Sequence, residues 1–281
     1  MIDITAIILT RNEEDYLGDC IDSIKSFCKR IVVVDSFSED KTVEIAKSKG
    51  AEVFAHEFVN YAKQYKYAVD IANVKTKWIL RIDADERFSK ESAEEIERLC
   101  IENENTNING FVIRFVNIFM GKKMYHGGLY PFQKLAVYKT GLGDIEDRNM
   151  DEHIILSEGT YAYCKKDGFH YAYRGLDFFV NKHNWYSSRE ARDYFENKAV
   201  SEKNSSKMTS IKMNRYYRLP IFFRAKMYYL YRYYWLRGFL DGTEGRIIAF
   251  MHAYWYRFLV DAKIYEYEHG QSDFRKLGPL K

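Results

Sequence analysis

Residues 78–86 read WILRIDADE, an apolar stretch that ends in two aspartates one residue apart. The apolar first half predicts a buried strand. Side chains two residues apart in an extended chain point to the same side, so Asp83 and Asp85 should face one spot. That spot lies at the carboxyl end of the strand, where α/β sheets bind ligands. Two carboxylates there suit Mg²⁺ or Mn²⁺ holding a diphosphate, although acidic pairs are also common on solvated turns.

This stretch belongs to a regular alternation of strand and helix patterns over the first hundred residues. Strands are predicted at residues 4–10, 30–35, 51–55 and 78–83, and helices at 12–28, 41–49, 62–72 and 89–102. Gly50 is predicted to end the second helix and Ser89 to cap the fourth. The order predicts a parallel sheet with helices on both faces. Later strands at 110–119 and 134–140 lack a full helix between them and should pair as a mixed extension.

Length and composition limit the classes of protein that fit. The 281 residues suffice for one sizeable domain, or one domain with an appendage. The 43 basic residues nearly balance the 40 acidic ones, so nucleic acid is not an expected partner. Four cysteines without a C-x-x-C spacing indicate neither a zinc site nor a disulfide framework. We expect no signal peptide, and no apolar run reaches the roughly 18–20 residues that span a bilayer, so a cytoplasmic protein is predicted.

Polar residues follow three of the first four predicted strands, namely TRNE at 10–13, Asp35 and Asp83. Turn-forming residues at strand ends would explain any one of them. Three at the same sheet edge instead indicate a nucleotide site. The G-x-G-x-x-G and G-x-x-x-x-G-K-[ST] loops are absent from the sequence. A diphosphate would therefore be neutralised mainly by a metal ion and by basic side chains.

An ordered set of segments resembles the family 2 glycosyltransferases, inverting enzymes with the GT-A nucleotide-sugar-binding fold. The matching segments are TRNEE at 10–14, VVVDSFSEDKT at 32–42, AKQYKYA at 62–68, RIDADE at 81–86, HGGLYP at 126–131, NMDEH at 149–153 and HYAYRGLDFFVNKHNWYSSREA at 170–191. The match covers nearly the whole chain and looks like the bacterial branch that builds lipopolysaccharide core, O-antigen or exopolysaccharide. It implies an α/β fold, with a Rossmann-like mixed sheet flanked by helices.

The resemblance also implies roles for single residues of the donor site. The nucleoside pocket would be lined by Thr10, Arg11 and Glu13, the base or ribose held by Asp35, the ribose touched by Asp83, and the metal ion bound by Asp85. His170 is the candidate for a second metal ligand, although a lone histidine is usually structural. Lys66 would bind the donor from the Gln64-Tyr65-Lys66 segment, where the family usually has Asn. Phe37 stands where the family usually has Gly, so the base and sugar preferences stay open.

An inverting transfer needs a carboxylate that deprotonates the acceptor hydroxyl. By the resemblance, Asp151 and Glu152 in NMDEH occupy that position. Neighbouring residues of an extended segment cannot both face the site, and relatives with His-Glu here favour Glu152 as the base. An ordinary acidic turn is the alternative. Further along, Lys182 and His183 would either reach the diphosphate or acceptor or lie on a solvated helix face.

Aromatic residues make up 17 % of the chain and are concentrated near its end. Residues 215–240 read RYYRLPIFFRAKMYYLYRYYWLRGFL, with six basic residues and no acid. This pattern predicts a helix lying on an anionic membrane surface, and 246–265 predicts a second aromatic helix. We therefore expect a GT-A domain at 1–214 and a helical hairpin at 215–281. A dimer interface or core packing is the alternative, and a single-stranded nucleic-acid platform is disfavoured because the rest of the chain is not basic.

Taken together, the sequence predicts an inverting, metal-dependent glycosyltransferase. It would move a hexose or N-acetylhexosamine from a nucleotide sugar, with UDP the expected nucleotide, to a lipid-linked saccharide at the cytoplasmic face of the inner membrane. A haloacid-dehalogenase-type phosphotransferase also uses Asp-x-Asp, but on its first strand rather than its fourth. A non-catalytic membrane scaffold is the other alternative, and the intact Asp85 and Asp151/Glu152 argue against it. The sugar, the acceptor, the linkage and the oligomeric state stay open.

Overall fold

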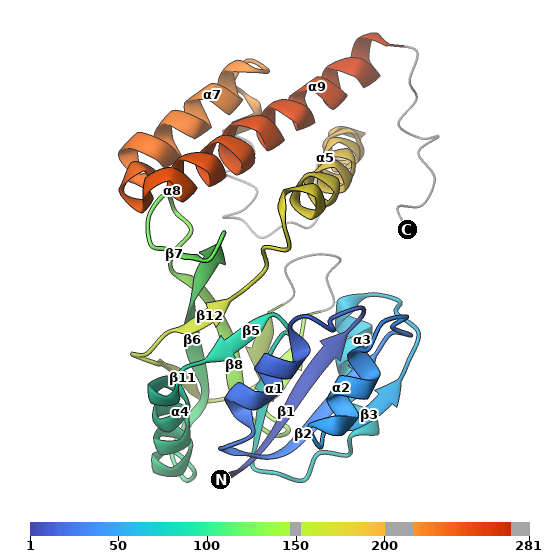
Figure 1. The fold of residues 1–281 in the computed structure, drawn as a ribbon, viewed down its shortest axis with the longest axis vertical. Helices are drawn as coiled ribbons and strands as arrows, with labels where there is room; N and C mark the ends of the chain where they lie inside the picture. Colours follow the sequence, from blue (N-terminus) through green and yellow to red (C-terminus); the bar gives the residue numbers. More distant parts are fainter. Residues whose placement is uncertain (147–152, 200–215, 271–281) are drawn as a thin grey trace. The chain divides into compact units, whose positions relative to one another are not determined.

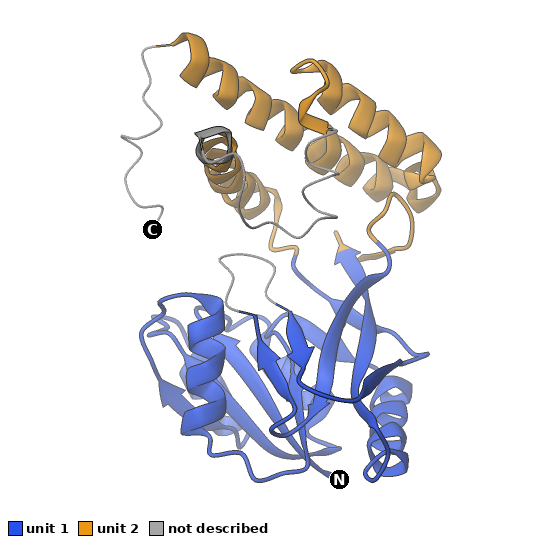
Figure 2. Ribbon diagram, turned by 180° about the vertical axis from the view of Figure 1, so that it is seen from behind, with its two compact units in different colours: residues 1–118, 130–172 blue, residues 119–129, 173–281 orange. Residues whose placement is uncertain are grey.

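The computed structural model describes residues 1–146, 153–199 and 216–270, with 196–199 described by backbone alone, and it contains two compact units. Unit 1 comprises residues 1–118 and 130–172, and unit 2 comprises residues 119–129 and 173–281 (Figure 2). The sequence-based boundary between residues 214 and 215 adjoins a segment outside the described residues. That boundary stays a prediction.

Unit 1 is built on a mixed sheet with the strand order β3-β2-β1-β4-β8-β6-β12-β5 (Figure 1). Its strands are β1 (Ile2–Thr10), β2 (Cys28–Asp35), β3 (Glu52–Ala55), β4 (Trp78–Arg81), β5 (Glu86–Phe88), β6 (Ile108–Phe119), β8 (Phe132–Lys139) and β12 (Gly168–His170). Strand β11 (Thr160–Tyr163) also pairs with β6, while β9 (Gly143–Ile145) and β10 (Ile154–Leu156) form a separate pair. The first four strands are parallel, and β8 runs antiparallel to β4 and β6. The predicted mixed extension is confirmed, with Gly110 opposite Tyr138.

Four helices cover the parallel part of the sheet, as the alternating sequence pattern predicts. They are α1 (Leu17–Ile24), α2 (Thr42–Ser48), α3 (Tyr61–Ile71) and α4 (Lys90–Glu102). One face of the sheet packs with Ile21 of α1 and Ile96 of α4, and the other packs with Ala68 of α3. Neighbouring strand residues serve opposite faces, since Val33 belongs to the first core and Val32 to the second. Burial on both faces explains why these strands are almost wholly apolar.

Local details differ from the predicted boundaries at two places. Helix α1 begins at Leu17 rather than at residue 12, because Asn12 adopts a left-handed φ of 57° and its N–H donates to Ser38 Oγ at 2.8 Å. Strand β4 ends at Arg81 rather than at residue 83. A turn follows it, with the Glu86 N–H donating to the Asp83 carbonyl at 2.9 Å.

The two predicted caps are confirmed. Ser89 accepts a hydrogen bond from the Ser92 N–H at 3.2 Å and so caps α4. Gly50 follows the end of α2 with a φ of 84°, a conformation that favours glycine.

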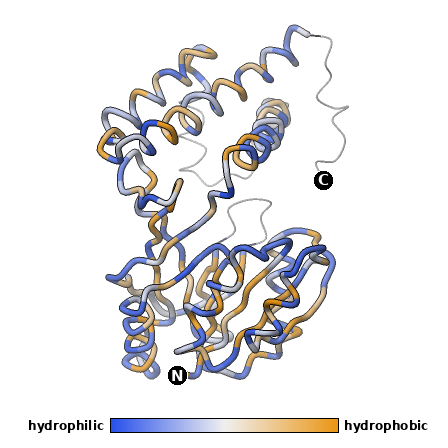
Figure 3. Tube along the Cα trace, in the orientation of Figure 1, coloured by the Kyte–Doolittle hydropathy of each residue, from blue (hydrophilic) through white to orange (hydrophobic). Residues whose placement is uncertain are grey.

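Unit 2 is helical. It contains β7 (Lys122–Met124), α5 (Leu176–Ala199), α7 (Phe223–Leu230), the π-turn η1 (Tyr231–Trp235), the 3₁₀ turn η2 (Gly238–Asp241), α8 (Gly242–Ile248), the π-turn η3 (Ala249–Trp255) and α9 (Tyr256–His269). One core joins Ala191 of α5 to Val260 and Ile264 of α9. Polar and apolar residues are interspersed along these helices (Figure 3). Among the described residues, no helix is both long enough and apolar enough to cross a membrane.

Candidate active site

The carboxyl ends of β1 and β2 bring Thr10 and Asp35 together. The parallel register places the two residues side by side, and Thr10 Oγ1 donates to Asp35 Oδ1 at 2.9 Å. The Ser38 N–H donates to the other carboxylate oxygen at 2.8 Å. Both Thr10 and Asp35 are buried. The Asp35 carboxylate is therefore held in one orientation by a strand end and by the loop that follows it.

The other two residues of the predicted nucleoside pocket lie in the loop after β1. Arg11 is exposed, and Glu13 is half-buried with its N–H donating to Thr42 Oγ1 at 2.7 Å. This loop is cross-linked to the loop after β2, because the Glu39 N–H donates to Asn12 Oδ1 at 2.9 Å. Thr10, Arg11, Glu13 and Asp35 thus belong to one connected pair of loops.

Phe37 sits at the tip of the second of these loops. Its φ is 56°, the left-handed conformation that glycine adopts without strain, and 62 % of its surface is exposed. The backbone thus keeps the conformation suited to the usual glycine, while this chain places an aromatic ring there.

The side chains of Gln64, Tyr65 and Lys66 on α3 differ in burial. Gln64 is fully buried, and its Nε2 donates to Ser36 Oγ at 3.0 Å, which supports the loop after β2. Tyr65 is in the core, with its hydroxyl 2.8 Å from that of Tyr138. Lys66 is exposed, and its amine lies 3.5 Å from the Asp144 carboxylate. Donor binding by Lys66 stays a prediction.

Asp83 is held by a cluster of polar and charged side chains that sequence reasoning missed. The Tyr61 hydroxyl donates to Asp83 Oδ1 at 2.7 Å, and Lys134 Nζ donates to Oδ2 at 3.0 Å. Arg81 Nε in turn donates to the Tyr61 hydroxyl at 3.1 Å. Burial alone would raise the pKa of Asp83, but Lys134, Arg81 and these hydrogen bonds hold it well below its usual range. Asp83 is therefore an anion fixed from both sides.

The same lysine contacts a second buried carboxyl group. Lys134 Nζ lies 2.5 Å from Glu86 Oε2. Complete burial raises the pKa of Glu86 to about 7, even though Lys134 opposes the rise. The neighbouring Asp83 charge adds to the rise. One lysine thus serves two carboxyl groups at the end of β4. A lysine within the apolar strand pattern of 134–140 was the available sequence signal, because a buried amine needs acidic partners.

The two predicted metal ligands meet in the structure. Strand β12 pairs antiparallel with β5, which sets His170 opposite Glu86 and leaves His170 Nε2 3.4 Å from Asp85 Oδ2. The other ring nitrogen, Nδ1, lies 2.9 Å from Asn117 Oδ1. Burial would raise the pKa of Asp85 and lower that of His170, but their mutual contact reverses both shifts. Asp85 is therefore an anion beside a histidine that is oriented by Asn117.

The strand-based reason for pairing Asp83 with Asp85 was wrong, because β4 has ended before Asp83. The two carboxylates have different partners, Lys134 and Tyr61 for the first and His170 for the second. They are still close enough for the charge of Asp83 to oppose the lowering of the Asp85 pKa.

These donors fit a divalent ion that is completed by its substrate. Within the described parts of the chain, no group of three or more His, Cys, Asp or Glu side chains could hold a metal ion. Asp85 and His170 supply one oxygen and one nitrogen. Mg²⁺ and similar ions are often held by one or two carboxylates, with water and substrate phosphates as the other ligands. The assignment of Asp85 and His170 as metal ligands stays a prediction.

Several predicted residues lie elsewhere. The candidate bases Asp151 and Glu152 lie outside the described residues, so their assignment stays a prediction. Lys182 and His183 belong to α5 of unit 2, where Lys182 is exposed. His183 Nδ1 is 2.8 Å from the Phe179 carbonyl, and its ring stacks on the Phe179 ring.

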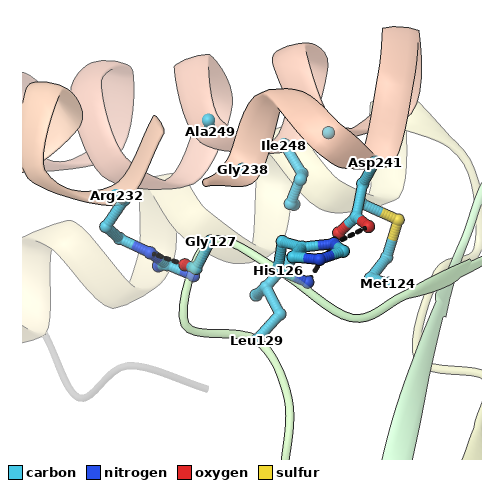
Figure 4. Close-up of a pocket in the computed structure, with 10 residues that line it drawn as sticks. Met124, His126, Gly127, Leu129, Arg232, Gly238, Asp241, Ile248 and Ala249 are labelled. Atoms are coloured by element: carbon cyan, nitrogen blue, oxygen red, sulfur yellow. Dashed lines mark hydrogen bonds and ion pairs between the residues drawn. The ribbon is translucent and has the colours of Figure 1, made fainter. Parts of the chain in front are cut away.

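The HGGLYP motif begins with a structural connection inside unit 2 (Figure 4). Asp241 accepts hydrogen bonds from the N–H of His126 at 2.8 Å, and its other oxygen lies 2.7 Å from His126 Nδ1. Gly127 and Gly128 have φ values of 66° and 72°, and a Cβ at Gly128 would lie 2.9 Å from Leu236 Cδ1. The cavity beside these residues measures about 10 Å³, room for about one water molecule and far too little for a nucleotide.

The chain is similar in sequence to known glycosyltransferases. Over 273 residues, the chain is 29 % identical to an uncharacterized glycosyltransferase of Rickettsia bellii, covering 94 % of this chain and 86 % of that protein. It is 27 % identical over 276 residues to the lipopolysaccharide core biosynthesis glycosyltransferase LpsC of Rhizobium meliloti, covering 94 % and 92 %. Glucosyl-3-phosphoglycerate synthase from Mycobacterium tuberculosis, solved with Mn²⁺ and UDP, has 19 % identity and a TM-score of 0.33 over 41 % of this chain and 43 % of that one.

The family match covers nearly the whole sheet that carries the candidate site. Residues 5–169 match the model of Glycosyl transferase family 2, from within β1 to within β12. The predicted α/β GT-A fold and the glycosyltransferase class are confirmed by this match together with the mixed sheet. The chain belongs to glycosyl transferase family 2.

Proposed function

We propose that this protein transfers a hexose or N-acetylhexosamine, with inversion, from a UDP-linked donor to a lipid-linked saccharide. The product would serve lipopolysaccharide or other cell-surface polysaccharide synthesis. The main support is the edge of the unit 1 sheet. Thr10 and Asp35 end the parallel strands β1 and β2, Asp85 lies in the turn after the parallel strand β4, and His170 at the end of β12 contacts Asp85. Carboxyl edges of such sheets are where α/β proteins bind nucleotides.

Four residues of the proposed donor site have surroundings that support their roles. Asp35 is oriented to accept a hydrogen bond from the base or ribose, and Asp83 is an anion suited to the ribose hydroxyls. Asp85 and His170 would hold Mn²⁺ or Mg²⁺. The chemistry that such an ion would supply there is neutralisation of charge on the departing diphosphate.

The acceptor hydroxyl must lose a proton as it attacks the sugar, and a carboxylate is the group for that task. We assign this to Glu152, with Asp151 as the alternative. Glu152→Gln should then abolish transfer and keep donor binding, whereas the same result from Asp151→Asn would assign the base to Asp151.

The acceptor and the location follow from two observations. LpsC, which the chain matches over nearly its whole length, carries a lipopolysaccharide core biosynthesis name. The aromatic and basic residues of unit 2 suit an anionic membrane surface. We therefore propose a peripheral position at the cytoplasmic face of the inner membrane. The phosphotransferase alternative loses its support, because the Asp-x-Asp segment follows β4 in a family 2 glycosyltransferase.

Donor binding can be tested by thermal shift, because a ligand of the native state raises the melting temperature. UDP-, GDP-, CDP- and dTDP-sugars would each be measured with and without Mn²⁺. We expect a metal-dependent rise with a UDP-sugar that Asp85→Asn removes. Asp70→Asn, the same exchange at an exposed position of α3, should keep it.

Two outcomes would contradict the proposal. A shift that needs neither metal nor Asp85 would remove the metal assignment. The absence of a shift with every donor would favour a non-catalytic scaffold.

A further inference from the structure

Helix α7 and the π-turn η1 turn their large apolar side chains outward. Phe223, Met227, Tyr231, Tyr234 and Trp235 are all exposed, with Trp235 at 79 % and Tyr234 at 59 %. They recur every three or four residues, the spacing of one side of a helix. A helix of a globular protein normally buries such a stripe. Here the stripe is unpartnered among the described residues.

A different side of α7 and η1 buries charge. Arg224 is 1 % exposed and its Nε donates to Asp261 Oδ1 of α9 at 2.7 Å. Arg232 is buried too, and its Nε and Nη1 contact the Gly127 carbonyl at 2.5 Å and His252 Nδ1 at 2.8 Å. Turning the aromatic side inward would strand both guanidinium groups. The outward orientation of the aromatic side is therefore set by these pairs.

The exposed rings continue onto η3 and α9, which pack beside α7 (Figure 1). The chain of ring contacts runs from Tyr234 through Tyr233, Tyr229 and Tyr254 to Phe258, with centroid distances of 5.0, 5.5, 6.2 and 5.9 Å. Phe250 joins it by contacting Tyr254 at 5.6 Å. We call the exposed side chains of the stripe and of this ring chain together the aromatic face, which comprises Phe223, Met227, Tyr231, Tyr234, Trp235, Phe250 and Phe258.

Unpaired cations stand among these rings. Lys226 lies within the exposed stripe, Arg237 follows Trp235, and Arg246 lies one turn before Phe250. All three are exposed, and within the described part of the chain none of them makes an ion pair. The nearby carboxylates are already engaged, since Asp241 binds His126 and Glu244 pairs with Lys122 at 3.1 Å. The aromatic face is therefore bordered by net positive charge.

This charge decides between two possible occupants. A two-fold dimer through the aromatic face would bring the same three cations of each copy together without acids to balance them. An anionic bilayer offers phosphate groups for the cations and an acyl boundary for the rings.

We infer that the aromatic face docks on an anionic lipid bilayer, with Lys226, Arg237 and Arg246 on the headgroups and the rings at the acyl boundary. The inference deepens the proposed function, and rests on it, by naming the surface through which the enzyme would meet a lipid-linked acceptor.

The test is sedimentation of the full chain with vesicles of phosphatidylcholine alone or mixed equally with phosphatidylglycerol. We expect binding to the anionic vesicles that falls as salt rises. Tyr234→Ser/Trp235→Ser should weaken it by roughly tenfold or more, since two large side chains lose their apolar contact. Lys226→Ala/Arg246→Ala should weaken it by roughly 25-fold, since each of the two cations near an anionic surface contributes about fivefold. Tyr161→Ser, which removes a ring that is 53 % exposed in unit 1, is the matched control.

A second readout covers the case in which a variant misfolds. Lipids brominated on their acyl chains should quench tryptophan fluorescence of the native protein, and Trp235→Phe should remove most of that quenching. Binding that survives the double aromatic variant, or no binding to anionic vesicles, would overturn the inference. A dimer that this variant dissociates, without vesicle binding, would assign the face to a second copy.

The donor-dependent thermal shift, measured on the same variants, separates the two proposals. Loss of vesicle binding with the shift retained concerns the aromatic face alone. Loss of the shift with vesicle binding retained concerns the donor site alone.

Discussion

Both units bury charged side chains, but they balance the charges differently. In unit 1, Lys134 faces both Asp83 and Glu86, and Glu86 Oε1 has no hydrogen-bond partner among the described residues. In unit 2, Asp261 is matched by Arg224 and by the Phe222 N–H at 2.7 Å. An incompletely satisfied carboxyl cluster with shifted pKa values is typical of a functional site. A one-to-one pair between two helices serves the fold.

The same contrast explains how each unit presents its surface. The unit 1 cluster fixes Asp83 just after the end of β4, whereas the Arg224–Asp261 pair joins α7 to α9 and keeps the aromatic side outward. Equivalent substitutions in the two units should therefore have unequal effects on stability.

The largest expected effect is that of Asp261→Asn. Asp261 is fully buried, and the exchange leaves the Arg224 guanidinium without its counter-charge. We expect a loss of about 3–5 kcal/mol in the free energy of unfolding, measured by urea denaturation. Asp22→Asn, which breaks exposed pairs with Lys25 and Lys49, should cost less than about 1 kcal/mol. Equal losses in the two variants would refute a special role for the buried pair.

A pH effect is expected from His252 in unit 2. Burial, reinforced by Arg232, holds the pKa of His252 well below its usual range. Below pH 6.5 the unfolded chain binds a proton at His252 that the folded chain does not bind. The free energy of unfolding should therefore decrease as the pH is lowered, by up to about 1.4 kcal/mol per pH unit. His252→Gln keeps an acceptor for Arg232 and should flatten this fall between pH 7 and pH 5. The measurement is urea denaturation at each pH.

His269→Gln changes an exposed histidine and provides the control for this experiment. It should leave the pH dependence of native stability intact. An unchanged slope in His252→Gln as well would show that His252 does not titrate as inferred.

A smaller effect is expected at Phe37 in the loop after β2. The left-handed conformation of Phe37 costs an L-residue about 1–2 kcal/mol, and Phe37→Gly removes this strain. Glycine in turn costs about 0.5–1 kcal/mol of stability, because it has more conformational freedom in the unfolded chain. The melting temperature should therefore rise slightly. Tyr161→Gly, an exposed aromatic in β11 without that φ, should lower it. A decrease of similar size in both variants would mean that Phe37 makes stabilising contacts.

The smallest effect is expected from Glu86→Gln, the unit 1 counterpart of Asp261→Asn. Burial raises the pKa of Glu86 to about 7, so the carboxyl group gains little from its charge in the fold. The amide NH2 can take the Oε1 position, which has no partner to lose, while the amide oxygen keeps the contacts of Oε2 with Lys134 and the Asp83 N–H. The free energy of unfolding at pH 7 should change by less than about 1 kcal/mol. A loss as large as that of Asp261→Asn would remove the distinction between the two clusters.

The sequence by itself determined the parallel part of the sheet and the edge that carries the candidate site. Alternating strand and helix patterns are local, because each strand and helix shows its buried side through residues a few positions apart. That information sufficed to place Thr10, Asp35 and Asp83 at the ends of neighbouring parallel strands. The ordered motifs sufficed for the family, which the match over residues 5–169 confirms.

Only the tertiary structure decided which side chains complete the site and which side of α7 faces outward. Asp83 is held by Lys134 from β8, and Asp85 meets His170 because β12 pairs with β5. The aromatic side of α7 is outward because Arg224 pairs with Asp261. Each of these contacts joins segments far apart in the chain, and its energy depends on burial and on a precise partner. A pattern over a few neighbouring residues contains information on neither the burial of a side chain nor its distant partner.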